Sequence, residues 1–241
     1  MNSNKIACKG LLFDYGGTLD TRGDHWSEVI WDAYLHFGVD IDKAAFRDAY
    51  VHGERTLATH PIVTPQFHFR DVLREKLQLQ LEALNGRLQL SPEALRGQAE
   101  LMAQWLDEQT NRLLAENEYV LRRLKEAGYP MVLVSNFYGN ISQVLRDARL
   151  DGYFDQIIES AVVGVRKPNP AIFALGVCAL DLPASQVLVV GDTYTKDILP
   201  AHQLGCHTVW IKGRQWEEKE FDESVPDAVI TLLDDLLPRL I

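Results

Sequence analysis

Two aspartates stand directly after apolar runs of the sequence, and the residues around them point to chemistry. Asp14 ends the first run, and Gly16 and Gly17 follow it at once. Asp192 ends a later run, with Asp197 five residues further on. A carboxylate at a strand end can attack an electrophile, and two of them can hold a hard cation. Glycines let backbone N–H groups approach an anion closely. This pattern predicts a nucleophile beside a metal site.

A hydroxyl, an amide and an ammonium complete the candidate site. Ser135 and Asn136 follow the apolar run 131–134, and Lys167 precedes Pro168 in a loop that cannot be helical at its prolines. In a doubly wound sheet, the carboxyl ends of parallel strands meet in one crevice. We therefore expect the two carboxylates to form a Mg²⁺ site there, and the hydroxyl and the ammonium to form a phosphate site.

These four segments resemble the four motifs of the haloacid dehalogenase-like superfamily, whose members are mostly Mg²⁺-dependent phosphotransferases. The motifs occur in the family's order and span residues 11 to about 205. The resemblance implies an α/β fold, with a Rossmann-like doubly wound parallel sheet as core and an inserted all-helical cap of the C1 type. It also implies Mg²⁺ as cofactor and an aspartyl-phosphate intermediate.

The resemblance implies a role for each of these residues. Asp14 is the expected nucleophile, with Ser135 and Lys167 as further catalytic residues. The groups expected to bind the phosphate are the Gly17 N–H and the side chains of Ser135, Asn136 and Lys167. The groups expected to hold Mg²⁺ are Asp14, the Gly16 carbonyl, Asp192 and Asp197. Asp197 has three roles open to it besides that of an acidic residue near a helix start: direct ligation, ligation through water, or orientation of Lys167.

One position departs from the family's pattern. The phosphatases of the family usually carry a second aspartate two residues after the nucleophile, as general acid to the leaving group, and here that position is Gly16. General acid catalysis is typically worth about two to four powers of ten in rate. Asp20, Asp24 and His25 are the nearest possible substitutes. We expect Asp20 to belong to the next turn and His25 to lie on the surface at the start of a helix.

The leading prediction is a Mg²⁺-dependent phosphohydrolase that acts on a small phosphorylated metabolite and favours good leaving groups. The first alternative is a catalytically impaired module that binds phosphate or metal. The second is a 2-haloacid dehalogenase, in which halide leaves unprotonated, so that no acid is needed. That chemistry also needs no Mg²⁺, and the Gly-Asp pair at 191–192 is typical of a metal site, so we rank it last.

Bulk properties exclude several partners. A chain of 241 residues with 46% hydrophobic residues suits one domain with an insertion. Its net charge of −10 argues against nucleic acid or an anionic membrane as the main partner. No apolar run is long enough to span a membrane, and the N-terminus lacks the apolar stretch of a secretory signal. Three widely spaced cysteines predict buried free thiols and a cytoplasmic location. The oligomeric state stays open.

The periodicity of apolar residues divides the chain into two parts. We expect a helical cap over 24–115, which moves through two short connections, and a core of 1–23 and 116–241. The predicted cap helices cover about 24–38, 42–59, 67–84 and 91–114. The predicted strands cover 6–13, 131–135, 157–160, 187–191, 208–211 and 228–230. Strand–helix alternation at this spacing indicates parallel pairing with right-handed crossovers.

Overall fold

A computed structural model describes residues 5–216 and 219–241, so that six residues of the predicted core, 1–4 and 217–218, lie outside the described residues. Six parallel strands form one sheet in the order β3-β2-β1-β4-β5-β6. The strands are β1 (Gly10–Phe13), β2 (Met131–Ser135), β3 (Gln156–Glu159), β4 (Val187–Gly191), β5 (His207–Ile211) and β6 (Ala228–Ile230). This order confirms the predicted doubly wound sheet, although its first strand is shorter than the predicted 6–13.

Both faces of the sheet are covered, as its continuously apolar strands require. Leu12 packs in one cluster with residues of helices α7 (Ala171–Leu180) and α8 (Leu199–Gln203). Its neighbours Leu11 and Phe13 pack on the opposite face, with residues of α5 (Ile141–Asp147) and α9 (Leu237–Leu240). Shorter helical segments complete the layers: η1 (Asp151–Tyr153), α6 (Ser160–Val163), η2 (Ala184–Gln186), η3 (Tyr194–Ile198) and η4 (Leu233–Leu236).

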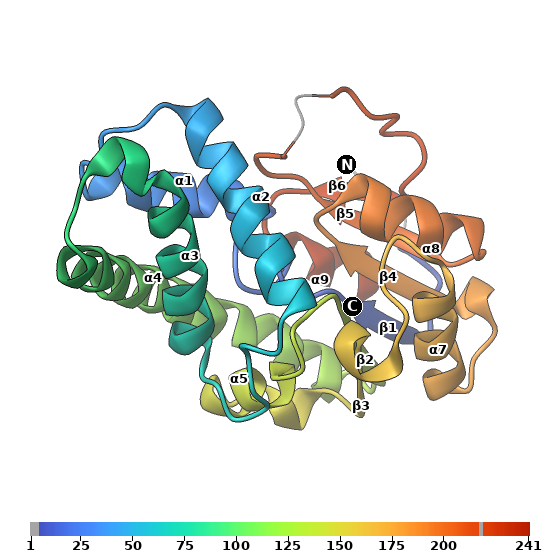
Figure 1. Ribbon diagram of the computed structural model, residues 1–241. Coiled ribbons are helices and arrows are strands. Elements are labelled where there is room, and N and C mark those ends of the chain that lie inside the picture. Colours follow the sequence, from blue (N-terminus) through green and yellow to red (C-terminus); the bar gives the residue numbers. More distant parts are fainter. Residues whose placement is uncertain (1–4, 217–218) are drawn as a thin grey trace.

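The segment 24–115 contains helices and no strand among its residues, all of which the structure describes. Helices α1 (Trp26–His36), α2 (Lys43–Thr59), α3 (Phe69–Leu88) and the first part of α4 (Pro92–Glu126) lie beside the sheet layer, on the left in Figure 1. Local signals set their starts: the Asp42 carboxylate caps α2, and the Ser91 hydroxyl caps α4. The helical insertion expected from the sequence is therefore present.

Helix α4 does not end near residue 114 as predicted. It runs for 35 residues from the insertion into the core, so that the predicted boundary at 115/116 falls inside a continuous helix. One of the two expected short connections is therefore absent. The Asn117 side chain donates to the Leu19 carbonyl (2.8 Å) and so ties this helix to the loop after β1.

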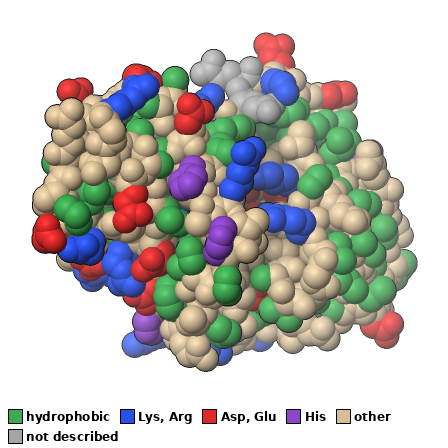
Figure 2. All heavy atoms as spheres, viewed as in Figure 1, with side chains coloured by type: hydrophobic (Ala, Val, Ile, Leu, Met, Phe, Trp, Pro, Cys, Tyr) green, Lys and Arg blue, Asp and Glu red, His purple; other side chains and the backbone are tan. Residues whose placement is uncertain are grey.

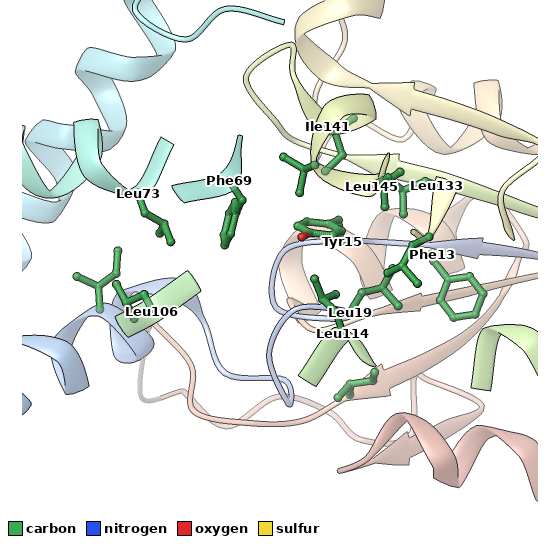
Figure 3. Close-up of a cluster of buried hydrophobic side chains, with 14 of the residues drawn as sticks. Phe13, Tyr15, Leu19, Phe69, Leu73, Leu106, Leu114, Leu133, Ile141 and Leu145 are labelled. Carbon is green, nitrogen blue, oxygen red and sulfur yellow. The ribbon is translucent and has the colours of Figure 1, made fainter. Parts of the chain in front are cut away.

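The insertion and the core share one hydrophobic cluster. In Figure 3, Tyr15 and Leu19 lie between Phe13 on the core side and Phe69 on the insertion side. The Tyr15 ring meets those of Phe69 and Phe137 edge to face, with centroids 6.4 Å and 5.7 Å apart. The loop after β1 is therefore packed between the two parts of the chain.

The structure also bears on the expected lack of a membrane-spanning segment and on the three cysteines. No helix among the described residues has the length and apolar character needed to cross a membrane. The three cysteines are free, but only Cys206 is buried, and Cys178 is exposed. The prediction that all three thiols are buried was therefore wrong, because an apolar sequence context does not tell which side of a helix faces solvent.

The Phe69 ring packs the insertion against Tyr15 in the loop after β1. We therefore expect Phe69→Ala to lower the free energy of unfolding by about 3 kcal/mol. Leu101→Ala is the matched control, because Leu101 is 56% exposed on the same insertion, and we expect it to cost less than about 0.5 kcal/mol. Urea unfolding followed by circular dichroism measures both values. Equal costs would show that the shared cluster does not hold the two parts together.

Candidate active site

Three neighbouring strands deliver the candidate residues to one edge of the sheet. Asp14 follows β1, Ser135 ends β2 and Asp192 follows β4, and β1 lies between the other two. All three side chains are buried. This is the crevice at the carboxyl ends of the strands, where doubly wound sheets place their sites. The structure thus brings together what the apolar runs predicted.

Lys167 connects two of the carboxylates. Its Nζ lies 2.7 Å from Asp14 Oδ1 and 2.7 Å from Asp197 Oδ1, and only 3% of the residue is exposed. Burial lowers the pKa of this ammonium, but the charges of Asp14 and Asp197 outweigh that effect and hold the pKa above its ordinary value. Lys167 is therefore a fixed cation, aimed at the carboxylate that would attack.

The three aspartates together form a concentrated negative charge. One oxygen from each of Asp14, Asp192 and Asp197 lies within 4.8 Å of the others. Burial, followed by the charges of Asp197 and Asp14, raises the pKa of Asp192 well above its ordinary value. A single ammonium cannot balance three buried carboxylates. Their hard oxygen donors fit Mg²⁺, which would supply the missing positive charge.

Two glycines allow these groups to lie so close together. Gly17 has a φ of +94°, and a Cβ on it would lie 2.3 Å from the Cγ of Asp192. A Cβ on Gly191 would lie 2.4 Å from the Cβ of Asp197. Any side chain at either position would push a carboxylate out of the cluster, so both glycines are needed for close approach.

Two residues that sequence reasoning missed, Thr193 and Trp210, form hydrogen bonds to Asp192 and Asp197. The Thr193 hydroxyl donates to Asp192 Oδ2 (3.1 Å), and the Thr193 N–H donates to Asp197 Oδ2 (3.0 Å). The Trp210 indole donates to the Asp192 carbonyl (2.6 Å). Thr193 could have been noticed because it directly follows the Gly-Asp pair. Trp210 gave no signal, because its partner Asp192 is 18 residues away and follows a different strand.

Two predicted phosphate-binding groups have other partners. The Gly17 N–H donates to Asp20 Oδ1 (2.6 Å), a carboxylate of its own loop. The Asn136 Oδ1 accepts from the Lys167 N–H (2.9 Å), and its amide donates to the Lys167 carbonyl (3.1 Å). Both ends of Asn136 thus hold the backbone of Lys167. Asn136 thus acts on the site through the lysine, and its expected contact with phosphate stays a prediction.

A cavity of about 760 Å³ opens over this edge of the sheet, between the core and the insertion. Asp14, Ser135 and Lys167 line it from the core, and residues of α2 and α3 line it from the insertion. Figure 2 shows Lys and Arg side chains gathered around a hollow near the middle of this face. The cavity is large enough for a small organic substrate.

The insertion contributes a polar cluster to the cavity wall. Lys76 on α3 is buried, and its Nζ lies 2.6 Å from Glu54 Oε1 on α2. From the core, the Tyr138 hydroxyl donates to Glu54 Oε2 (2.9 Å). Lys76 also lies over the Tyr138 ring, 5.3 Å from its centroid. No motif marked these residues, because each of them contacts partners distant in sequence.

The position of the missing acid is open to a side chain. A Cβ on Gly16 would meet only Trp26, at 3.7 Å, which is ordinary van der Waals contact. The Trp26 indole donates to Asp20 Oδ2 (2.9 Å). Asp20 is a structural residue of the loop, as expected, and is not among the described residues that line the cavity.

Asp24 and His25, the other two possible acids, are also unsuited to protonate a leaving group. The Asp24 carboxylate forms an ion pair with Arg214. His25 is half-buried in the cavity wall, where its ring caps α1 by accepting from the Ser27 N–H, so the expectation of a surface histidine was wrong. Burial, aided by the charge of Lys196, lowers the pKa of His25 to about 4. At neutral pH His25 is therefore uncharged.

Comparison with known proteins agrees with this geometry. A glyceraldehyde 3-phosphate phosphatase of Pyrococcus furiosus is 33% identical over 50% of this chain and 51% of its own length. A phosphoglycolate phosphatase of Pectobacterium atrosepticum is 33% identical over 57% of this chain and 58% of its own. The chain therefore spans little more than half the length of these curated relatives.

Among solved structures, an L-2-haloacid dehalogenase matches 96% of this chain and 97% of its own, with 27% identity and a TM-score of 0.59. The family model described as haloacid dehalogenase-like hydrolase matches residues 8–205. This match covers all four motifs on which the resemblance was based. The chain therefore belongs to the family of haloacid dehalogenase-like hydrolases.

Proposed function

We propose that this hydrolase cleaves small organic phosphates through a phosphorylated Asp14. One observation carries the proposal: the Lys167 ammonium lies 2.7 Å from both Asp14 and Asp197 at the floor of a cavity. An attacking carboxylate next to a fixed cation suits an anionic phosphoryl group. The names of the Pyrococcus and Pectobacterium relatives support the same class of substrate.

In the proposed first step, the Asp14 carboxylate attacks phosphorus, the ester bond to the leaving group breaks, and an acyl phosphate forms on Asp14. Lys167 compensates the charge of the phosphoryl oxygens, and the Ser135 hydroxyl donates to one of them. Water then attacks the acyl phosphate, releases phosphate and regenerates the carboxylate. Asp14, Asp192 and the Gly16 carbonyl, with Asp197 directly or through water, would hold Mg²⁺, which supplies charge neutralisation.

We further propose that 24–115 acts as the cap of this site over a core of 1–23 and 116–241. The cavity lies between these two parts and both line it, so that the cap selects the substrate and excludes water. A cytoplasmic location also remains a prediction, based on the sequence.

Dehalogenation of a 2-haloacid is the second candidate, and Gly16 specifically favours it. Halide leaves without a proton, so the lack of an acid at this position would cost such an enzyme nothing. The solved L-2-haloacid dehalogenase that resembles this chain agrees with that reading. The three clustered aspartates favour phosphoryl transfer instead, because attack on carbon needs no divalent cation.

An assay of phenyl phosphate, acetyl phosphate and 2-chloropropionate, each with and without Mg²⁺, separates these functions. We expect phosphate release that requires Mg²⁺ and falls at least about a thousandfold in Asp14→Asn. Asp151→Asn, at an exposed aspartate, is the control and should retain full activity. Chloride release without Mg²⁺ would show a dehalogenase. Binding of phosphate without any turnover would show an impaired binding module.

We expect kcat/KM of the wild type to rise steeply as the pKa of the leaving group falls, because Gly16 offers it no proton. Gly16→Asp should raise the hydrolysis of alkyl phosphates at least about tenfold and flatten this dependence. The side chain has room there. The asparagine of Gly16→Asn has the shape of aspartate but no acidic proton. This variant should therefore change neither the hydrolysis of alkyl phosphates nor the dependence on the pKa of the leaving group. A flat dependence in the wild type would mean that another acid serves the site.

His25 gives a prediction for pH dependence. Its pKa is about 4 in the folded chain against an ordinary 6.5, so the stability it contributes is present above pH 6.5 and is lost as pH falls toward 4. Between pH 7 and 4.5 we expect the wild type to lose about 2 kcal/mol more than His25→Asn, which keeps a capping side chain. Urea unfolding across this range measures the difference. If the wild type and His25→Asn lost the same stability over this range, the pKa of His25 would not be lowered in the folded chain.

A further inference from the structure

Three cations line the cavity and have no part in the proposed phosphoryl transfer: Arg55, Arg166 and Lys196. All three are exposed. Across the described residues, their side chains form no ion pair with a carboxylate. Lys76 in the same wall differs, because Glu54 neutralises it at 2.6 Å. The three exposed cations therefore present uncompensated positive charge to whatever enters.

Each of the three follows or precedes a residue that the structure holds firmly. Arg166 precedes Lys167, whose backbone is held at both ends by Asn136. Lys196 precedes Asp197, whose carboxylate accepts from the Thr193 N–H.

Arg55, the third cation, follows Glu54 on α2, and Glu54 is bound by Lys76 and Tyr138. The backbones that carry all three cations are thus fixed relative to the floor of the cavity. Preorganised charge of this kind binds a ligand at a smaller entropic cost than charge on a flexible loop.

Because the chain as a whole is negatively charged, an anionic substrate depends on local positive charge in the cavity. With a net charge of −10, the protein as a whole repels an anionic substrate. The floor of the cavity already carries its own cation, Lys167, for the transferred phosphoryl group. Blue side chains gather around the hollow in Figure 2, at the mouth of a cavity much larger than a phosphate. Arg55, Arg166 and Lys196 line this cavity and are exposed, so they are available to bind a different part of the substrate.

We propose that the substrate carries a second anionic group, a carboxylate or a further phosphate, that binds Arg55, Arg166 and Lys196 while its reacting phosphate contacts Lys167. This inference rests on the proposed function for the identity of the reacting group. It names the substrate class as phosphate esters with two anionic ends. Tyr50, Glu54 and Tyr138 line the same cavity and would contact the part of the substrate that joins those ends.

Two pairs of probes test the second anionic group. Phenyl phosphate and 3-carboxyphenyl phosphate have leaving groups of similar acidity and differ in one carboxylate. Phenylphosphonate and 3-carboxyphenylphosphonate are their non-hydrolysable counterparts. The ratio of kcat/KM within the first pair, and of Kd by calorimetry within the second, reports recognition of that carboxylate. Both are measured on the wild type with Mg²⁺ present.

In the wild type we expect both ratios to favour the carboxylated compound at least about tenfold. Arg55→Ala, Arg166→Ala and Lys196→Ala should each reduce the ratios about two- to fivefold, as for one exposed charge contact. Arg112→Ala is the matched control: this exposed arginine of α4 lies outside the cavity lining, and its loss should leave both ratios unchanged.

The two measurements separate the inference from the proposed function. Hydrolysis of both phosphates with ratios below about two would overturn the second-anion site and leave the phosphohydrolase intact. Discrimination between the phosphonates without hydrolysis of either phosphate would overturn the proposed reaction and support the site. An equal drop in Arg112→Ala would also overturn the site, because it would show attraction by the overall charge of the protein only.

Discussion

The ion pair of Lys167 with Asp14 and Asp197 is the interaction on which the site depends. Buried carboxylates are costly unless they are paired, and three of them meet here at one sheet edge. The rest of the site serves this arrangement. The glycines at 17 and 191 admit the carboxylates, and Asn136 fixes the lysine backbone. The remaining negative charge is what makes the cluster suited to a divalent cation.

For the proposed reaction the site lacks a proton donor, and the neighbouring side chains do not supply one. The space beside Gly16 is bordered by Trp26. The Asp20 carboxylate accepts from the Gly17 N–H and the Trp26 indole, and His25 is neutral in the cavity wall. In the proposed mechanism, Asp14 and Lys167 are placed for attack on phosphorus, while no side chain is placed to protonate the leaving group. Such a combination favours substrates whose leaving groups are stable as anions.

Sequence reasoning located the strand ends well, because long apolar runs that stop at a polar residue have one physical explanation in a parallel sheet. It failed wherever a partner is distant in sequence. The partners of Asn136 and the Lys76–Glu54 pair depend on tertiary packing. Sequence reasoning also missed one local contact, from the Gly17 N–H to the carboxylate of Asp20, three residues further on. The predicted boundary near residue 115 falls inside helix α4 because its apolar pattern is interrupted at Ala115 and Glu116, both of which are exposed.

The continuity of α4 has a consequence for exchanging caps between members of the family. An α-helix turns about 100° and rises about 1.5 Å for each residue. Adding or removing one residue near 115, within the 35-residue helix, would swing everything N-terminal of that point around the helix axis relative to the strand ends. A functional chimera joined there must preserve the helical phase, so that the permitted insertions are those close to whole turns.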